Sequence, residues 1–273
     1  MTLAEIFPDE DYRFHFGFQR GNVREFFRPT AQHDDLIAQR RFWLQSAPAT
    51  YAALLPEGIP LVDEALSLAR SEQTLPPDDS FTLVPKNTPL ERCVALGLAW
   101  EPDCLLLKPE TGGPVRLVAG CVCFPSSWSL ADKIGRPIES IHGVVPGLNA
   151  ALGNRIQNFL TKLRPGAAWL RANWGLSRSP ELNQHPSRDL PRLDATVRLE
   201  EVWVRIEHQA LAALPQTQGI LFGIRIAIRP LAEIRQERPL AQRLIRALKT
   251  MPEPMAQYKN IAPARGRVIE LLA

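Results

Sequence analysis

The segment GILFGIRIAIR, residues 219–229, constrains the fold more than any other stretch, because its side chains alternate with the two-residue period of a β-strand. Every second residue from Ile220 to Ile228 is large and apolar, so one face of this strand must be buried. The opposite face carries Leu221, Gly223, Arg225, Ala227 and Arg229. Two further strands are predicted at residues 167–176 and 196–206, and together the three favour an antiparallel sheet.

Helical patterns come mainly before these strands. Two helices are predicted within residues 31–70 and a third at 90–100, with loops near 56–60 and 76–88. A hairpin follows, with strands at 104–110 and 116–124 and a turn at Gly112–Gly113. Further helices are predicted from the capping box of Ser129 and Asp132 as far as Gly135, at 148–163, and at 239–249.

This order of elements lacks βαβ alternation and contains no glycine-rich nucleotide loop, so it predicts an α+β fold. We expect one domain over residues 1–273 with a helical N-terminal layer, and a separate helical subdomain over 1–90 remains an alternative. The N-terminus has no signal-peptide pattern, and no apolar run is long enough to span a membrane, so we expect a cytoplasmic protein.

Charge gives little evidence for a nucleic-acid partner. The net charge is +3, but residues 225–267 contain ten Lys and Arg against three Glu. Such a stretch is usually a solvated helix face, and this one has only one aromatic residue, Tyr258, for base stacking. We therefore expect neither nucleic acid nor a membrane as partner.

Few residues in the chain suit catalysis or metal binding. The four cysteines form no CxxC pair, the five histidines form no HExxH motif, and GxSxG is absent, so neither a zinc site nor a serine hydrolase is indicated. His142 precedes the small residue Gly143 in an apolar setting, which suits either an axial ligand of a planar cofactor or a structural histidine.

Two strands carry arginines that are open to more than one interpretation. Gly223 and Ala227 flank Arg225 and would leave room beside its guanidinium, as in a pocket wall, although the same face would also suit solvent. Arg171 and Asn173 share a strand face with Trp169, and they are either a buried polar pair or exposed.

Several motifs in a fixed order give the chain a family resemblance. CVCFPSSW, DKIGRP and SIHGVVP are the strongest, followed by WEPDCLLL, VRIEHQALAALPQTQGILFGIRIAI and PEPMAQYK. Together they make the chain similar to the alpha subunit of haem-dependent oxidative N-demethylases. That resemblance implies a PAS-like antiparallel sheet with flanking helices that holds haem b. It also implies oxidation of a small amine with dioxygen, using electrons from a separate NAD(P)H-dependent partner that carries flavin and an iron–sulfur cluster.

Carried onto this chain, the resemblance implies His142 as the axial ligand of the haem iron. It implies Arg225 as the catalytic residue of the distal pocket, where it would polarise bound dioxygen. Trp128 and Val145, in the motifs CVCFPSSW and SIHGVVP, are expected to contact the cofactor. His208 is a second candidate ligand, and thiolate ligation by Cys123 is a third possibility alongside its interpretation as a buried small hydrophobe.

The chain also departs from the family pattern. Relatives often have ERQTL where this chain has EHQAL at residues 207–211, and IRTY where it has IRIA at 224–227. The loss of the threonine and the tyrosine makes dimethylamine doubtful as substrate and predicts a more apolar or larger one. A haem-based gas or redox sensor without turnover, or a haem-binding module, is the alternative function, and a relative that has lost haem is a third.

Overall fold

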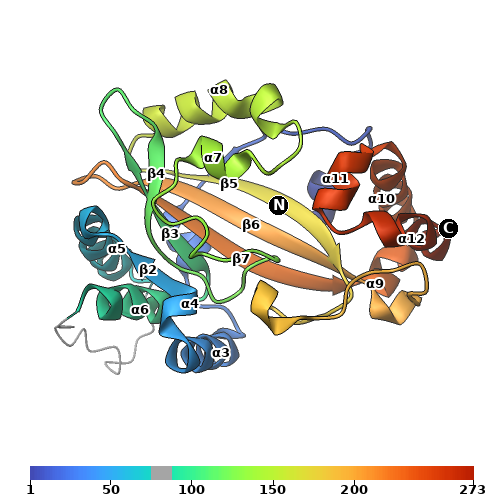
Figure 1. The fold of residues 1–273 in the computed structure, drawn as a ribbon, viewed down its shortest axis with the longest axis horizontal. Helices are drawn as coiled ribbons and strands as arrows, with labels where there is room; N and C mark the ends of the chain where they lie inside the picture. The colour runs from blue at the N-terminus through green and yellow to red at the C-terminus, as the bar shows by residue number, and fades with distance from the viewer. Residues whose placement is uncertain (75–87) are drawn as a thin grey trace.

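One antiparallel sheet of seven strands organises the computed structural model, which describes residues 1–74 and 88–273 (Figure 1). Its strand order is β1-β5-β6-β7-β3-β4-β2. The strands are β1 (Gln19–Gly21), β2 (Ala52–Leu54), β3 (Asp103–Pro109), β4 (Val115–Cys121), β5 (Ala168–Ser177), β6 (Trp203–Ala213) and β7 (Ile220–Pro230). The predicted α+β class, with helices flanking an antiparallel sheet, is confirmed. Nearly all of the loop predicted at 76–88 lies outside the described residues.

The long strands β5, β6 and β7 form the centre of the sheet. Residues 203–213 of β6 pair with residues 220–230 of β7 without a register shift, and the predicted strand at 219–229 is confirmed. The predicted strand at 196–206 is wrong over its first seven residues. A 3₁₀ turn (Leu199–Glu201) stands there, because the carboxylate of Glu201 accepts the backbone N–H of Arg198 and pairs with Arg178.

Helices cover the sheet in three groups. They are α1 (Leu3–Ile6), α2 (Val23–Phe27), α3 (His33–Ser46), α4 (Pro48–Tyr51), α5 (Ile59–Ser71), α6 (Pro89–Ala99), α7 (Ile138–His142), α8 (Leu148–Lys162), α9 (Leu231–Gln236), α10 (Arg238–Thr250), α11 (Glu253–Tyr258) and α12 (Arg265–Leu272). Figure 1 shows α3, α5 and α6 at one end, α9–α12 at the other, and α7 and α8 along one side. Within the described residues, no helix is long and apolar enough to cross a membrane.

The helical N-terminal layer packs tightly on β3 and β4. α6 begins with a capping box between Thr88 and Glu91, and its Gly97 lies so close to β4 that a Cβ there would be 2.0 Å from the Cys121 sulfur. Beneath α3, Arg40 donates to Asp103 at 2.6 Å, and both side chains are almost completely buried. The layer therefore shares one core with the sheet.

At the opposite end, α10 positions the N-terminal segment. Leu240, Leu244 and Leu248 form its buried face, while the guanidinium of Arg246 binds Asp11 at 2.9 Å. The positive stretch predicted to be a solvated face is thus partly used to hold residues 9–11, which lead into a chain segment alongside the sheet. This placement brings residues 8–19 to the site described below.

The short helix predicted from Ser129 to Gly135 is wrong, because the structure has turns there. The carbonyl of Leu130 accepts the N–H groups of both Lys133 and Ile134, which closes a single turn. Gly135 then has φ 79° and donates to the carbonyl of Leu117 at 2.7 Å. The bond to β4 draws the chain onto the sheet edge before a second helical turn forms.

Candidate functional site

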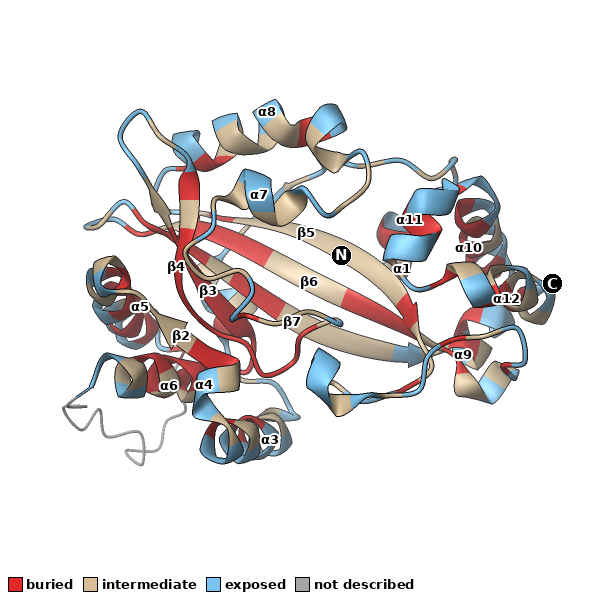
Figure 2. Ribbon diagram, viewed as in Figure 1, coloured by how far each residue is buried: buried red, intermediate tan, exposed pale blue. Residues whose placement is uncertain are grey.

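A cavity of about 720 Å³ lies between the sheet, α7, the start of α8 and the N-terminal segment 8–19. Its apolar wall comes from two sides of the fold. The sheet contributes Leu105, Leu107, Leu117, Phe222 and Ile224, and the helices contribute Ile138, Ile141 and Ile156. β5 has few fully buried residues along its middle (Figure 2), because side chains of this strand face the cavity. The volume lies within the range of small-molecule and cofactor pockets.

The sheet floor of this cavity is polar where β5 meets β6. Cross-strand pairs place Arg171 opposite Gln209 and Asn173 opposite Glu207, and all four line the cavity. The Glu207 carboxylate accepts from the Ser126 hydroxyl at 2.6 Å and from the Gln209 amide at 3.0 Å. These bonds fix the only carboxylate among the described floor residues of β5 and β6.

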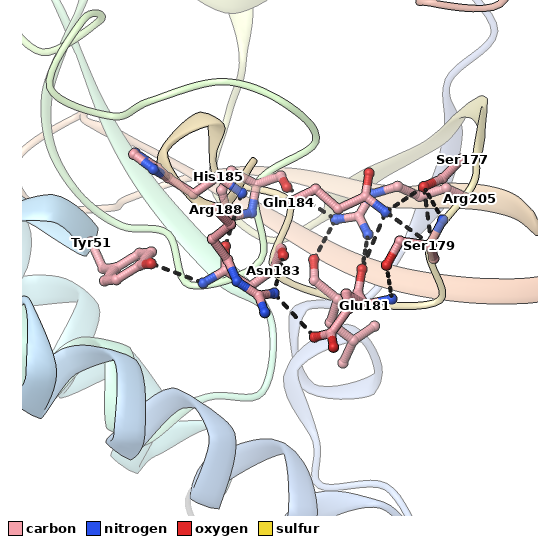
Figure 3. Close-up of polar contacts among 11 residues, drawn as sticks. Tyr51, Ser177, Ser179, Glu181, Asn183, Gln184, His185, Arg188 and Arg205 are labelled. Atoms are coloured by element: carbon pink, nitrogen blue, oxygen red, sulfur yellow. Dashed lines mark hydrogen bonds and ion pairs between the residues drawn. The ribbon is translucent and has the colours of Figure 1, made fainter. Parts of the chain in front are cut away.

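Arg205 anchors the loops at the end of the cavity. Its side chain donates to the Ser126 hydroxyl at 2.7 Å and to the carbonyls of Phe124 and Leu182 at 2.7 and 2.8 Å. Figure 3 shows the guanidinium among the polar groups of the 177–188 loop, where Gln184 binds the Ser177 hydroxyl. Burial lowers the pKa of Arg205 to about 10, so the group stays charged at neutral pH. Because its bonds join β6 to two loops that are distant in the sequence, Arg205 acts as a structural clamp.

Three other cations at the cavity form no direct ion pair with any described residue, although the negative charge of Glu207 acts on each of them. Among residues 1–74 and 88–273, none of Lys133, Arg171 and Lys259 forms an ion pair. Lys133 lies 4.1 Å from the centre of the Trp128 ring, and Arg171 lies 5.7 Å from that of Phe18. Burial lowers the pKa of all three, in Lys259 to about 8. Unpaired charge in a half-buried cavity is costly, so the site favours an anionic ligand.

His142 ends α7 and lines the same cavity. Burial, together with the positive charges of Arg171 and Lys133, lowers the pKa of its imidazole to about 4. Within the described part of the chain, neither ring nitrogen has a hydrogen-bond partner. A neutral imidazole with a free nitrogen is the form that binds a metal ion.

The structure brings Trp128 and Val145 together with His142. Both line the cavity, and the N–H of Val145 donates to the His142 carbonyl at 2.9 Å. Trp128 lies beneath the Lys133 ammonium. Three of the residues expected to hold the cofactor therefore surround one cavity, and their roles there stay predictions.

Arg225 does not line this cavity. Its guanidinium pairs with buried Glu101 and donates to the carbonyls of Phe26 and Arg28 at 2.8 and 3.2 Å, on the opposite face of the sheet. The open space expected beside it is filled, because a Cβ at Gly223 would lie 2.5 Å from the Phe27 ring. Its expected place in a pocket wall is thus corrected, and a catalytic role for it has no support from its position.

The other two candidate ligands also lie outside the cavity lining. His208 is the cross-strand neighbour of Arg225, on the face turned away from His142. Cys123 is buried in the core of the helical layer, where its N–H donates to Asp103 at 2.7 Å. Burial raises the pKa of its thiol well above the ordinary value, which disfavours a thiolate ligand.

Sequence reasoning missed Glu207 and Lys259. Glu207 lies in a strand where Val204 and Ile206 are buried and Arg205 and Glu207 alternate with them, so this alternation was an available signal for a polar cavity floor. Lys259 follows α11 in a loop, and no local pattern identifies its contact with the carbonyl of Trp174 at 2.6 Å.

Comparison with known families finds a match over most of this chain. A family model described as "Haem-dependent oxidative N-demethylase, alpha subunit-like" matches residues 70–269. The matched range includes His142, Glu207, Lys259 and the strands that form the cavity floor.

Proposed function

This chain belongs to the haem-dependent oxidative N-demethylase alpha-subunit-like family, and from that membership we propose that it is a haem b-dependent monooxygenase acting on a small amine-type substrate. The observation that supports this proposal best is the neutral, unpartnered imidazole of His142 on the wall of a cavity of about 720 Å³. His142 is the proposed iron ligand.

The residues of the cavity fit haem. Haem is a flat, largely apolar ring that carries two carboxylates, and its iron would bind an imidazole. The apolar wall formed by Leu105, Ile141 and Phe222 suits the ring. Lys133 and Arg171, the two cations that act on the imidazole of His142, would pair with the carboxylates. Among the described residues, no three His, Cys, Asp or Glu are grouped to hold a metal ion, whereas haem would need only one ligand of this kind.

When bound, haem supplies one-electron and dioxygen chemistry that protein side chains lack. The protein groups bind and orient. Ile138 and Ile141 exclude water from the wall beside His142, and Glu207, held by Ser126 and Gln209, offers a fixed negative charge to an ammonium group. A carboxylate in this position holds the amine in one orientation and stabilises its proton.

The proposal assigns electron delivery to a separate reductase. The four cysteines of the chain are free and buried, and among the described residues no three His, Cys, Asp or Glu are grouped as an iron–sulfur cluster would need. The basic helix α10 has Arg243 and Arg246 bound to the N-terminal segment, while Lys249 is exposed. An acidic reductase surface would dock there by charge complementarity.

An ultraviolet–visible spectrum of the haem-reconstituted protein tests this function. We expect a Soret band in the wild-type protein that is lost or strongly shifted in His142→Ala. The band should persist in the control variant His208→Ala. His208 is half-buried and lies on β6, on the face of the sheet turned away from the cavity. Absence of the Soret band in the wild-type protein would contradict the oxygenase proposal. A stable dioxygen complex without amine-dependent consumption of reductant would favour the sensor instead.

A further inference from the structure

Two opposite charges flank Asn173 on the cavity floor without pairing with each other. Glu207 is the direct cross-strand partner of Asn173, and the ammonium of Lys259 donates to the Asn173 side-chain oxygen at 3.2 Å. Directly opposed residues on neighbouring strands have Cβ atoms about 5 Å apart. Nevertheless, within the described chain the Lys259 nitrogen lies beyond ion-pair distance of the Glu207 oxygens, because both groups are held by other partners.

Both groups keep unused hydrogen-bonding capacity. The Lys259 ammonium has three N–H groups and donates two, to the Trp174 carbonyl and to Asn173. Each oxygen of the Glu207 carboxylate accepts one hydrogen bond and has room for another. Both residues line the cavity. A molecule that carries a carboxylate and an ammonium a few bonds apart would satisfy both charges at once.

We propose that the substrate of this cavity is a zwitterionic N-alkyl amino acid, whose carboxylate binds Lys259 and whose secondary ammonium binds Glu207. This inference rests on the proposed oxygenase function and narrows its substrate to amines that also carry a carboxylate. A plain dialkylamine is a cation, and it would leave Lys259 and its charged neighbours without an anion.

The reaction balances with the reductase already proposed. The amine R–NH–CH₃ takes up one dioxygen, two electrons and two protons. A C–H bond of the methyl group is oxidised and the N–CH₃ bond breaks. The products are the primary amine R–NH₂, formaldehyde and water. The two electrons come from the external reductase.

A carboxylate at Lys259 has two possible sources, the substrate and a haem propionate. Lys259 also lines a second, smaller cavity of about 200 Å³, beside Gln184 and Asn260. His142 and the two cations proposed to pair with the propionates, Lys133 and Arg171, do not line that second cavity. The position of Lys259 at the junction of the two cavities favours the substrate.

Calorimetric titration of the haem-reconstituted protein tests the inference with two small amines of similar size. N-methylglycine carries the carboxylate and dimethylamine lacks it. We expect N-methylglycine to bind at least tenfold more tightly to the wild type. Lys259→Met should weaken N-methylglycine binding about tenfold to hundredfold, the range for a lost charged hydrogen bond, and leave dimethylamine within about twofold. Lys249→Met removes an exposed lysine outside the cavity and should change neither value.

Further measurements distinguish a substrate carboxylate from a haem propionate, and the amino-acid proposal from the oxygenase proposal. Lys259→Arg should retain the preference for N-methylglycine, and Glu207→Gln should weaken both amines. A Lys259→Met variant that loses haem affinity but keeps N-methylglycine binding would assign Lys259 to a propionate and overturn the inference. Equal binding of both amines to the wild type would also overturn it, even if the variant fails to fold. Selective N-methylglycine binding by a protein without a Soret band would support the binding site while the oxygenase proposal fails.

Discussion

At the scale of single residues, buried arginines form ion pairs on one face of the sheet, whereas the buried and half-buried cations on the cavity face form none with the described residues. Beneath the helical layer, Arg40 pairs with Asp103 and Arg225 pairs with Glu101. Burial alone would raise the pKa of Glu101, but hydrogen bonds from Thr30 and the charge of Arg225 outweigh that effect and lower it. On the cavity face, Lys133, Arg171 and Lys259 form no ion pair within the described chain, and Arg205 is held by a hydroxyl and backbone carbonyls instead of a carboxylate. This contrast separates structural charges from those available to a ligand.

Replacement of Arg225 tests whether the residue is structural. Arg225→Met leaves the Glu101 carboxylate buried without its cation, and we expect the free energy of unfolding to fall by about 2–4 kcal/mol. The Soret band of the haem-reconstituted variant should be unchanged, because the side chain lies away from the cavity. Equilibrium urea unfolding and an absorption spectrum measure the two effects.

Arg229→Met is the matched control, since Arg229 lies on the same strand but is exposed and pairs with Glu233, which is also exposed. We expect it to change stability by less than about 0.5 kcal/mol. An altered spectrum with unchanged stability in Arg225→Met would instead support the catalytic role.

At the scale of elements, local patterns predicted the long helices and strands, missed the short ones, and did not predict what covers each face of the sheet. The alternation of residues 219–229 placed Arg225 and Gly223 on one side of β7 correctly. It carried no information that α2, nearly 200 residues away in the chain, would place Phe27 against that side. The failed helix after Ser129 has the same origin, because its capping signal is local and the competing bond to Leu117 is not.

The contact between α6 and β4 gives a second prediction. Alanine usually stabilises a helix by about 1 kcal/mol relative to glycine. At Gly97, however, the added Cβ would lie 2.0 Å from the Cys121 sulfur, so Gly97→Ala should destabilise the protein by about 1–3 kcal/mol. Thermal or urea unfolding measures the change.

A second substitution separates crowding from other causes. Cys121→Ala removes the sulfur, so the double variant Gly97→Ala, Cys121→Ala should recover part of the stability lost in Gly97→Ala. Strictly additive losses in the two variants would show that the close approach is not the cause.

At the scale of the whole molecule, the cavity is built from segments that are far apart in the sequence. Tyr12 and Phe18 come from the N-terminal segment, His142 from α7, Glu207 from β6, and Lys259 from the loop after α11. The histidine was recognisable because a family motif surrounds it. The floor and the lysine were not, because their meaning depends on contacts across more than 80 residues, such as that between Lys259 and Asn173.

Haem binding should therefore protect these distant segments together. We expect backbone hydrogen exchange to slow at residues 12–19, 138–145 and 255–260 when the protein is loaded with haem, because all three line one cavity. The exposed outer turns of α10 provide an internal reference that should not change. Mass spectrometry of peptides from the apo and loaded protein makes the comparison. Protection confined to residues 138–145 would contradict a single enclosed site.

The position of Lys259 and Asn260 in the cavity wall has a consequence for biosynthesis. A ribosome releases these residues after the sheet, α7 and the N-terminal segment have already emerged. Until then one wall of the cavity is missing, and whatever the cavity holds is open to exchange with the surroundings. The proposed cofactor would accordingly be captured late, once Lys259 and Asn260 complete a wall that the segments made earlier leave open.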